Sequence, residues 1–65
     1  MKIAEIKQAV DDGKNVYWAS DAYKVIKDNI GHYLICSTFN NYCIGLTNQV
    51  GDELNGREDQ FYIVG

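Results

Sequence analysis

His32, Cys36 and Cys43 are the residues of this chain whose types could support nucleophilic chemistry. A cysteine nucleophile needs a base within hydrogen-bond reach, and histidine is the side chain that most often serves. His32 and Cys36 share the parity of one expected strand but stand roughly 13 Å apart along an extended chain. That separation prevents direct activation, and no third, orienting carboxylate is implied for Cys43. We therefore expect a surface histidine, no catalytic residue and no enzymatic activity.

Four acidic residues occur close together in the C-terminal part of the sequence: Asp52, Glu53, Glu58 and Asp59. Carboxylates are hard oxygen ligands, but these lack the alternating acidic spacing of a calcium loop. The glycines do not form a phosphate-binding loop either, because none opens a helix and no Gly-Lys-Ser/Thr follows. We expect no metal and no cofactor. The acidic side chains could instead occupy a basic groove of another protein, as a mimic of nucleic acid.

The length and composition predict one small folded domain spanning residues 1–65. Apolar residues make up 46% of the 65 residues and aromatic residues 12%, which favours a folded chain over a disordered one. The net charge of −3 disfavours a general electrostatic grip on phosphate backbones. The N-terminal residues lack the continuous apolar stretch of a signal peptide, so we expect a cytoplasmic protein with free thiols at Cys36 and Cys43.

One helical segment and five strands are expected. Residues 2–12 place Ile3, Ile6, Ala9 and Val10 on one helical face, and Gly13 follows as a left-handed C-cap. The strands are predicted at residues 15–19, 22–28, 32–38, 42–47 and 60–64, because apolar residues alternate there between turn signals. Ser20-Asp21 is predicted as the first turn, and Gly31 supplies a positive φ in the second.

The predicted fold class is α+β, with an N-terminal helix followed by a five-stranded antiparallel meander; an alternative is that the sheet curves into a small partial barrel. Side-chain parity assigns the two faces of the sheet. The expected core face carries Val16, Trp18, Tyr23, Val25, Tyr33, Ile35, Tyr42, Ile44, Leu46, Phe61 and Ile63. The opposite face carries Tyr17, Ile26, Leu34, Cys36 and Tyr62, and we expect curvature, the helix or a partner to cover part of it.

The turn between the third and fourth strands determines the environment of the cysteines. A type I′ turn centred on Asn40-Asn41 places Cys36 opposite Gly45, whereas one centred on Phe39-Asn40 places Cys36 opposite Cys43. The first is favoured because Asn tolerates a positive φ and Phe does not. Residues 48–60 are the least regular, and we expect either a small hairpin around Asn55-Gly56 or a pinned loop.

At the level of whole segments the chain resembles short uncharacterised proteins of tailed bacteriophages and prophages. The segments that carry the resemblance are Val16-Tyr17-Trp18, Tyr23-Lys24-Val25-Ile26, Gly31-His32-Tyr33-Leu34-Ile35, Ile44-Gly45-Leu46-Thr47 and Leu54-Asn55-Gly56 through Phe61-Tyr62-Ile63. These are strand and turn residues, so the resemblance supplies no catalytic or binding site. It implies a small phage accessory protein made inside a bacterium.

The function favoured by the sequence is a non-enzymatic protein-interaction module. We expect it to bind a host or phage protein through Tyr17, Ile26, Leu34 and Tyr62, or through the acidic residues of the C-terminal segment. Self-association through the same sheet face, as a homodimer, is a version of this hypothesis. One alternative is a nucleic-acid-binding small barrel, with Trp18 or tyrosines stacking on bases and Lys14, Lys24, Lys27 and Arg57 contacting phosphates. The other alternative is a homo-oligomeric structural protein.

Overall fold

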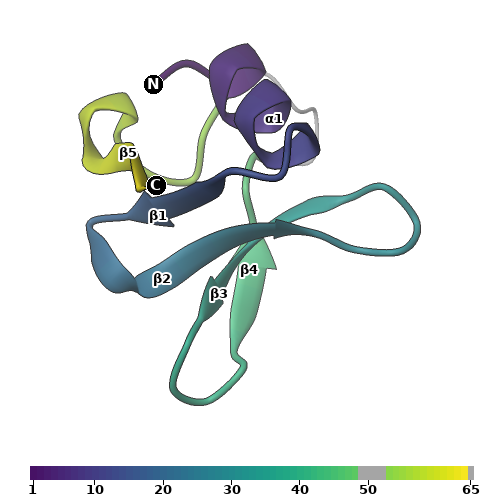
Figure 1. Cartoon of the computed structure of the whole chain (residues 1–65). Coiled ribbons are helices and arrows are strands. Elements are labelled where there is room, and N and C mark those ends of the chain that lie inside the picture. Colours follow the sequence, from purple (N-terminus) through teal and green to yellow (C-terminus); the bar gives the residue numbers. More distant parts are fainter. Residues whose placement is uncertain (49–52, 65) are drawn as a thin grey trace.

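The described part of the chain contains one α-helix, a short 3₁₀ helix and a five-stranded antiparallel sheet, which confirms the predicted α+β class. The computed structural model describes residues 1–48 and 53–64. The elements are α1 (Ile3–Asp11), β1 (Asn15–Trp18), β2 (Ser20–Lys27), β3 (Tyr33–Ser37), β4 (Cys43–Gly45), a short 3₁₀ helix η1 (Glu58–Gln60) and β5 (Phe61–Val64) (Figure 1). Within the described ranges, no helix has the length and apolar character needed to cross a membrane.

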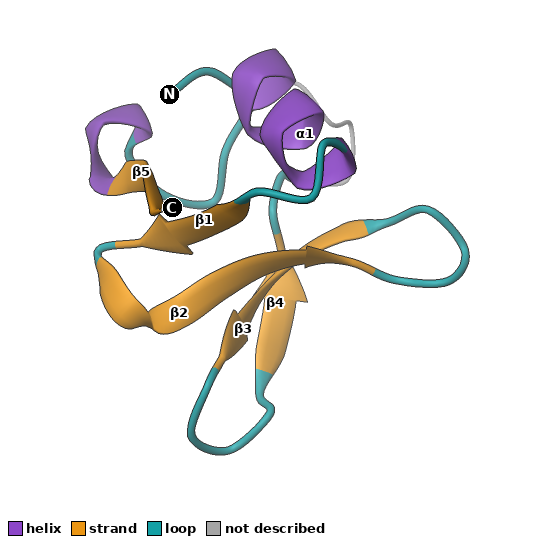
Figure 2. Cartoon of the chain, viewed as in Figure 1, coloured by secondary structure: helices purple, strands orange, loops and turns teal. Residues whose placement is uncertain are grey.

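The sheet has the strand order β4-β3-β2-β1-β5, with every neighbouring pair antiparallel. The first four strands follow one another as a meander, and β5 then returns to pair with β1 at the far edge (Figure 2). Because β4 and β5 lie at opposite edges, the sheet is not closed into a barrel. The hairpin of β3 and β4 projects away from α1, which lies over the β1 side of the sheet (Figure 1).

Local hydrogen bonds define both ends of α1. At its start, the Lys2 backbone N–H donates to Glu5 Oε1 at 2.9 Å. At its end, Gly13 has the predicted positive φ of 80°, and its N–H donates to the Val10 carbonyl while the Lys14 N–H donates to the Ala9 carbonyl. This pair of bonds is a Schellman motif, which satisfies carbonyls that the helix would otherwise leave unpaired.

The core lies between α1 and the sheet face predicted to be buried. Its buried members are Ile6, Ala9, Val16, Val25, Ile35, Leu46 and Phe61. The assignment was wrong for four residues of the same face, because Tyr23, Tyr42, Ile44 and Ile63 are exposed by 40%, 69%, 37% and 43%. The physical reason is length: a nine-residue helix spans only about 14 Å and packs on β1 and β2, so the rest of the face is open.

The first turn differs from the prediction at Ser20-Asp21. Strand β2 already begins at Ser20, and the chain reverses at Ala19, which has a positive φ of 63°. A register shift between Tyr17 and Trp18 accompanies this reversal. The second turn follows the prediction, because Gly31 has a φ of 90° and the Asp28 carboxylate accepts hydrogen bonds from two turn N–H groups.

The favoured register of the β3–β4 hairpin was wrong, and so was the expectation of free thiols. Cys36 lies opposite Cys43, and the two form a disulfide. The Ser37 N–H donates to the Tyr42 carbonyl, so the connection has four residues, with Asn41 at a φ of 60°. Both registers considered from the sequence assumed a two-residue turn; in the longer loop, Asn supplies the positive φ and Phe39 is not required to.

Residues 53–60 form the pinned loop that was one of the two expectations. Leu54 makes an antiparallel bridge with Thr47 and packs against the core. The Asn55 side-chain amide donates to the carbonyls of Gly45 and Thr47 at 3.0 and 2.9 Å. The loop is thereby attached to the end of β4. Asp52, one of the four predicted acidic site residues, lies outside the described residues.

Candidate interaction surfaces

The structure gathers the four predicted sheet-face residues on the side of the sheet opposite α1, here called the outer face. Strand pairing places Tyr17 beside Tyr62 and Ile26 beside Leu34. Ile26 and Tyr62 are 37% and 38% exposed, and Tyr17 and Leu34 are half-buried. Since the helix packs on the other face, the sequence-based alternative in which α1 covers these residues is excluded.

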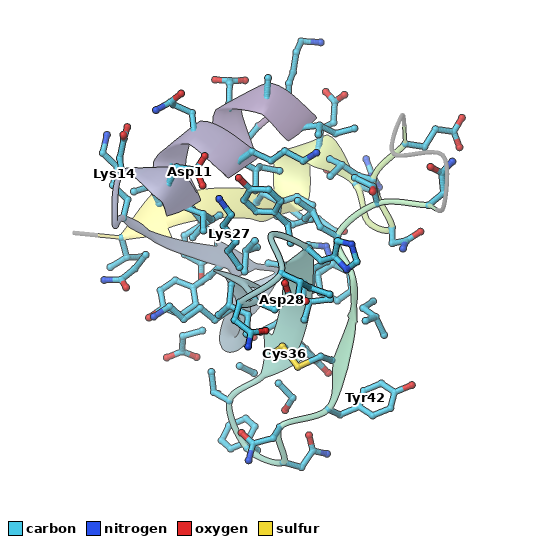
Figure 3. All side chains as sticks on the ribbon, turned by 90° about the vertical axis from the view of Figure 1, so that its right-hand side faces the viewer. Asp11, Lys14, Lys27, Asp28, Cys36 and Tyr42 are labelled. Atoms are coloured by element: carbon cyan, nitrogen blue, oxygen red, sulfur yellow. A yellow bond between two sulfur atoms is a disulfide. The ribbon has the colours of Figure 1, made fainter. Side chains whose placement is uncertain are left out.

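The outer face carries one continuous row of side chains across all five strands. Strand pairing aligns Cys43, Cys36, Lys24, Tyr17 and Tyr62 in that order. The rings of Tyr17 and Tyr62 lie 5.9 Å apart at one end of the row. The disulfide between Cys36 and Cys43 lies at the opposite end, and Figure 3 shows it beside the Cys36 label. The row has one charged member, Lys24, whose long aliphatic stem can lie along the apolar surface. Such a face is suited to contact with another protein surface.

A second candidate site was not predicted from the sequence. Trp18, Tyr23, Ile35, Tyr42 and Ile44 line a hollow of about 140 Å³, called the aromatic hollow below. It lies on the same sheet face as the core but beyond the reach of α1. Three of its members, Tyr23, Tyr42 and Ile44, are among the four residues that were predicted to be core and are exposed instead.

Trp18 is held firmly as one wall of the aromatic hollow. Its Nε1–H donates to Gln60 Oε1 at 3.2 Å, and the same oxygen accepts from the Arg57 backbone N–H at 3.3 Å. Gly56 lies against the indole so closely that a Cβ at this position would collide with it. The Tyr23 ring meets the indole edge-on at 5.3 Å. Asn55-Gly56 is typical of a turn, and no sequence signal links it to Trp18.

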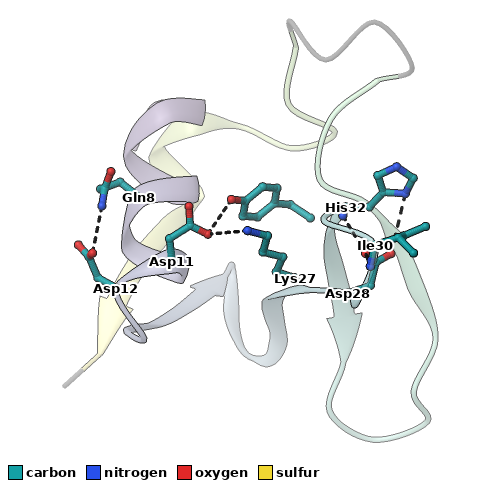
Figure 4. Close-up of polar contacts among 8 residues, drawn as sticks. Gln8, Asp11, Asp12, Lys27, Asp28, Ile30 and His32 are labelled. Carbon is teal, nitrogen blue, oxygen red and sulfur yellow. Dashed lines mark hydrogen bonds and ion pairs between the residues drawn. The ribbon is translucent and has the colours of Figure 1, made fainter.

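A polar cluster ties the end of α1 to β2 and β3. Asp11 accepts a hydrogen bond from the Tyr33 hydroxyl at 2.7 Å and lies 3.4 Å from Lys27 Nζ (Figure 4). The hydrogen bond from Tyr33, and then Lys27, hold the pKa of Asp11 below its usual value of 3.8. The same hydrogen bond raises the pKa of Tyr33, so this phenol loses its proton less readily than a free one. We interpret the cluster as structural.

Three ion pairs join a lysine or arginine to a carboxylate in the described residues. Lys2 lies 4.0 Å from Glu58, Lys27 lies 3.4 Å from Asp11, and Arg57 lies 3.2 Å from Asp59. Two of the four predicted mimic residues, Glu58 and Asp59, are therefore partly neutralised, while Glu53 is exposed. Of the four cations expected to contact phosphates, Lys27 and Arg57 are paired, Lys24 lies on the outer face, and Lys14 is exposed in the connection between α1 and β1.

The groups considered for catalysis are dispersed. His32 is exposed, and its nearest acidic partner is Asp28, 3.9 Å away (Figure 4). Both cysteines are joined in the disulfide, so neither offers a thiolate. No cluster of three or more potential metal ligands occurs in residues 1–48 and 53–64. Comparisons with protein-family models, curated sequences and solved structures gave no match.

Proposed function

We propose that this chain is a non-enzymatic protein-interaction module that binds a protein partner through the outer face of its sheet. The observation that carries the proposal is the gathering of Tyr17, Ile26, Leu34 and Tyr62 on a face that α1 does not cover. Aromatic residues are enriched in interface cores, and a domain of this size offers about 800 Å² to a standard interface. The resemblance to short phage proteins supports a host or phage protein as the partner.

Protein binding is favoured over nucleic-acid binding by the arrangement of charges. Nucleic-acid binding requires unpaired cations aligned along a surface, because phosphate contacts supply most of its affinity. Here Lys27 and Arg57 face carboxylates, and the row on the outer face contains the single cation Lys24. Mimicry by the acidic residues is disfavoured by the same pairing, since Glu58 and Asp59 each have a basic neighbour.

The proposal is tested by capturing partners from bacterial lysate with tagged Tyr62→Ala and Ile63→Ala variants. These neighbouring residues of β5 are 38% and 43% exposed but point to opposite faces of the sheet. We expect Tyr62→Ala to lower the affinity for a stoichiometric, nuclease-resistant protein partner by tenfold or more. This corresponds to a loss on the order of 1–2 kcal/mol for an aromatic contact. Ile63→Ala should leave the same partner bound.

Two results would contradict the proposal. Equal capture by both variants would remove the outer face from consideration as the binding surface. Recovery of only nuclease-sensitive material that elutes steeply with salt would instead indicate nucleic-acid binding. Circular dichroism of both variants checks that each is folded, which is expected because neither side chain belongs to the buried core.

A further inference from the structure

The hairpin of β3 and β4 is an uncharged arm on an otherwise charged molecule. Residues 33–48 contain no Asp, Glu, Lys or Arg, although the chain has fifteen such residues, six basic and nine acidic. β4 is an edge strand that pairs with β3 and with no second strand of the described residues, and the Asn55 side-chain amide binds the Gly45 carbonyl at its end. Proteins usually protect such edges with charged side chains, especially Lys, to prevent pairing with another chain. The arm lacks that protection.

The tip of this arm presents an exposed aromatic side chain. Phe39 is 84% exposed, the highest value among the large apolar side chains of the described residues. The disulfide between Cys36 and Cys43 and the hydrogen bond from the Ser37 N–H to the Tyr42 carbonyl fix the hairpin just behind this tip (Figure 3). An aromatic ring carried on a rigid hairpin loses little conformational freedom when it enters a pocket.

The aromatic hollow, which is lined by the arm together with Trp18 of β1 and Tyr23 of β2, has the size and lining to accept such a ring. Its volume of about 140 Å³ is below the range of about 300–1,000 Å³ that is typical of pockets for small molecules and cofactors, so it suits one side chain. Its walls are the rings of Trp18, Tyr23 and Tyr42 with Ile35 and Ile44. The Trp18 N–H is already bonded to Gln60, so what the wall offers is the apolar surface of the indole. Aromatic pairs add about 0.5–1.5 kcal/mol beyond the burial of their area.

We propose that two copies of this chain associate through their β3–β4 arms, each Phe39 entering the aromatic hollow of the other copy. An isologous dimer requires that the contact from one copy be returned by the second about a two-fold axis. An exposed ring at the tip of the arm and a hollow lined partly by the same arm allow such a reciprocal contact. The proposed occupant of the hollow is therefore Phe39 of a second copy.

Charge favours the arm as the place where two copies meet. Each copy has a net charge of −3, so contacts between charged surfaces would bring like charges together. An uncharged arm avoids this repulsion, and none of the residues that line the aromatic hollow is Asp, Glu, Lys or Arg. The contact is small, so we expect a weak dimer with a dissociation constant in the micromolar range or above. The outer face is on the other side of the sheet, so the inference is independent of the proposed function.

The test follows self-association of the purified chain by sedimentation equilibrium from about 5 µM to about 500 µM, the range expected for a small interface. Trp18 is the only tryptophan, so its fluorescence reports directly on the aromatic hollow. We expect a monomer–dimer equilibrium, with a Trp18 emission shift that follows the dimer fraction. Phe39→Ala should raise the dissociation constant at least about tenfold and abolish the shift.

The matched control is Ile30→Ala, which removes an apolar side chain that is 71% exposed in the β2–β3 turn, away from the arm. This variant should dimerise like the unchanged chain. A chain that stays monomeric at the highest concentration overturns the proposal. Dimerisation that survives Phe39→Ala, or that proceeds without a change in Trp18 emission, overturns it as well, because a different surface would then be responsible. Phe39 is too exposed for its loss to unfold the domain.

Discussion

Trp18 and Gly56 show how one residue contact determines a surface feature of this protein. Gly56 has an ordinary backbone conformation, so glycine is required there by space and not by φ. A Cβ on residue 56 would lie 2.9 Å from Trp18 Cε2 and closer still to Nε1. The indole cannot retreat freely, because Gln60 binds its N–H and the rings of Tyr23 and Phe61 pack around it.

We therefore predict that Gly56→Ala destabilises the domain by about 1–3 kcal/mol, the usual cost of overpacking a constrained site. Chemical denaturation followed by Trp18 fluorescence measures the free energy of unfolding. Glu53→Ala, an exposed substitution in the same loop, is the control and should change stability by no more than about 0.5 kcal/mol. An unchanged denaturation midpoint for Gly56→Ala would mean that the indole is not held against this loop.

Single residues also explain which parts of the structure could not be predicted from the sequence. Gly13 and Gly31 were correctly predicted to have positive φ, because glycine adopts that conformation without a steric penalty. Ala19 has the same sign of φ and gave no signal, since a left-handed alanine is disfavoured by about 1–2 kcal/mol and is held by its surroundings. The hydrogen bond from its N–H to the Gln60 carbonyl, a contact between distant parts of the chain, helps to hold this turn.

At the scale of elements, the alternation of apolar residues along the chain predicted the strands well. It did not predict which element covers each face of the sheet. The face parity of Val16, Val25, Ile35 and Phe61 was correct, and these residues form the core. Tyr42 has the same parity and is 69% exposed, because the extent of the core depends on where a short helix docks. The register of β3 and β4 depended on loop length, which periodicity does not specify. The docking position of the helix leaves the aromatic hollow open, and the loop length brings the two cysteines of the disulfide opposite each other.

The helix and sheet are joined by the cluster of Asp11, Tyr33 and Lys27, and this contact predicts a pH dependence. The pKa of Asp11 is lowered, mainly by the Tyr33 hydrogen bond, so its stabilising contribution is complete above pH 3.8 and is lost as pH falls through the folded-state value. The pKa values of Tyr33 and Lys27 are raised, first by hydrogen bonding to Asp11, so their contributions are present below pH 10.0 and pH 10.5 and are lost above.

Asp11→Asn should therefore reduce the loss of stability on both the acidic and the alkaline side. The measurement is the urea denaturation midpoint across both pH windows, compared with Asp12→Asn as the control. Asp12 is the adjacent carboxylate, and its partner is the Gln8 amide of the same helix instead of a group on the sheet. If both variants follow the pH profile of the unchanged chain, the cluster does not couple α1 to the sheet.

At the scale of the whole molecule, charge and apolar surface are separated along the sheet. Charged side chains occupy α1, β2 and the segment around η1, where several form pairs across elements. The β3–β4 arm has none. The outer face and the aromatic hollow lie on opposite sides of the sheet, so a dimer formed through the arms leaves two outer faces free. Such a dimer could present two copies of the outer face, which would raise the avidity for a repeated partner.

This separation predicts how salt should affect self-association. Because no ionised group lies on the arm, raising the salt concentration from about 50 mM to about 500 mM should change the dissociation constant less than about threefold, and any change should favour the dimer by screening repulsion between two chains of net charge −3. Sedimentation equilibrium at both concentrations measures this. A dimer held by ion pairs between Lys2, Lys27 or Arg57 and acidic residues of a second copy would instead weaken as salt rises. Steep weakening would thus place the contact on the charged side of the molecule and away from Phe39.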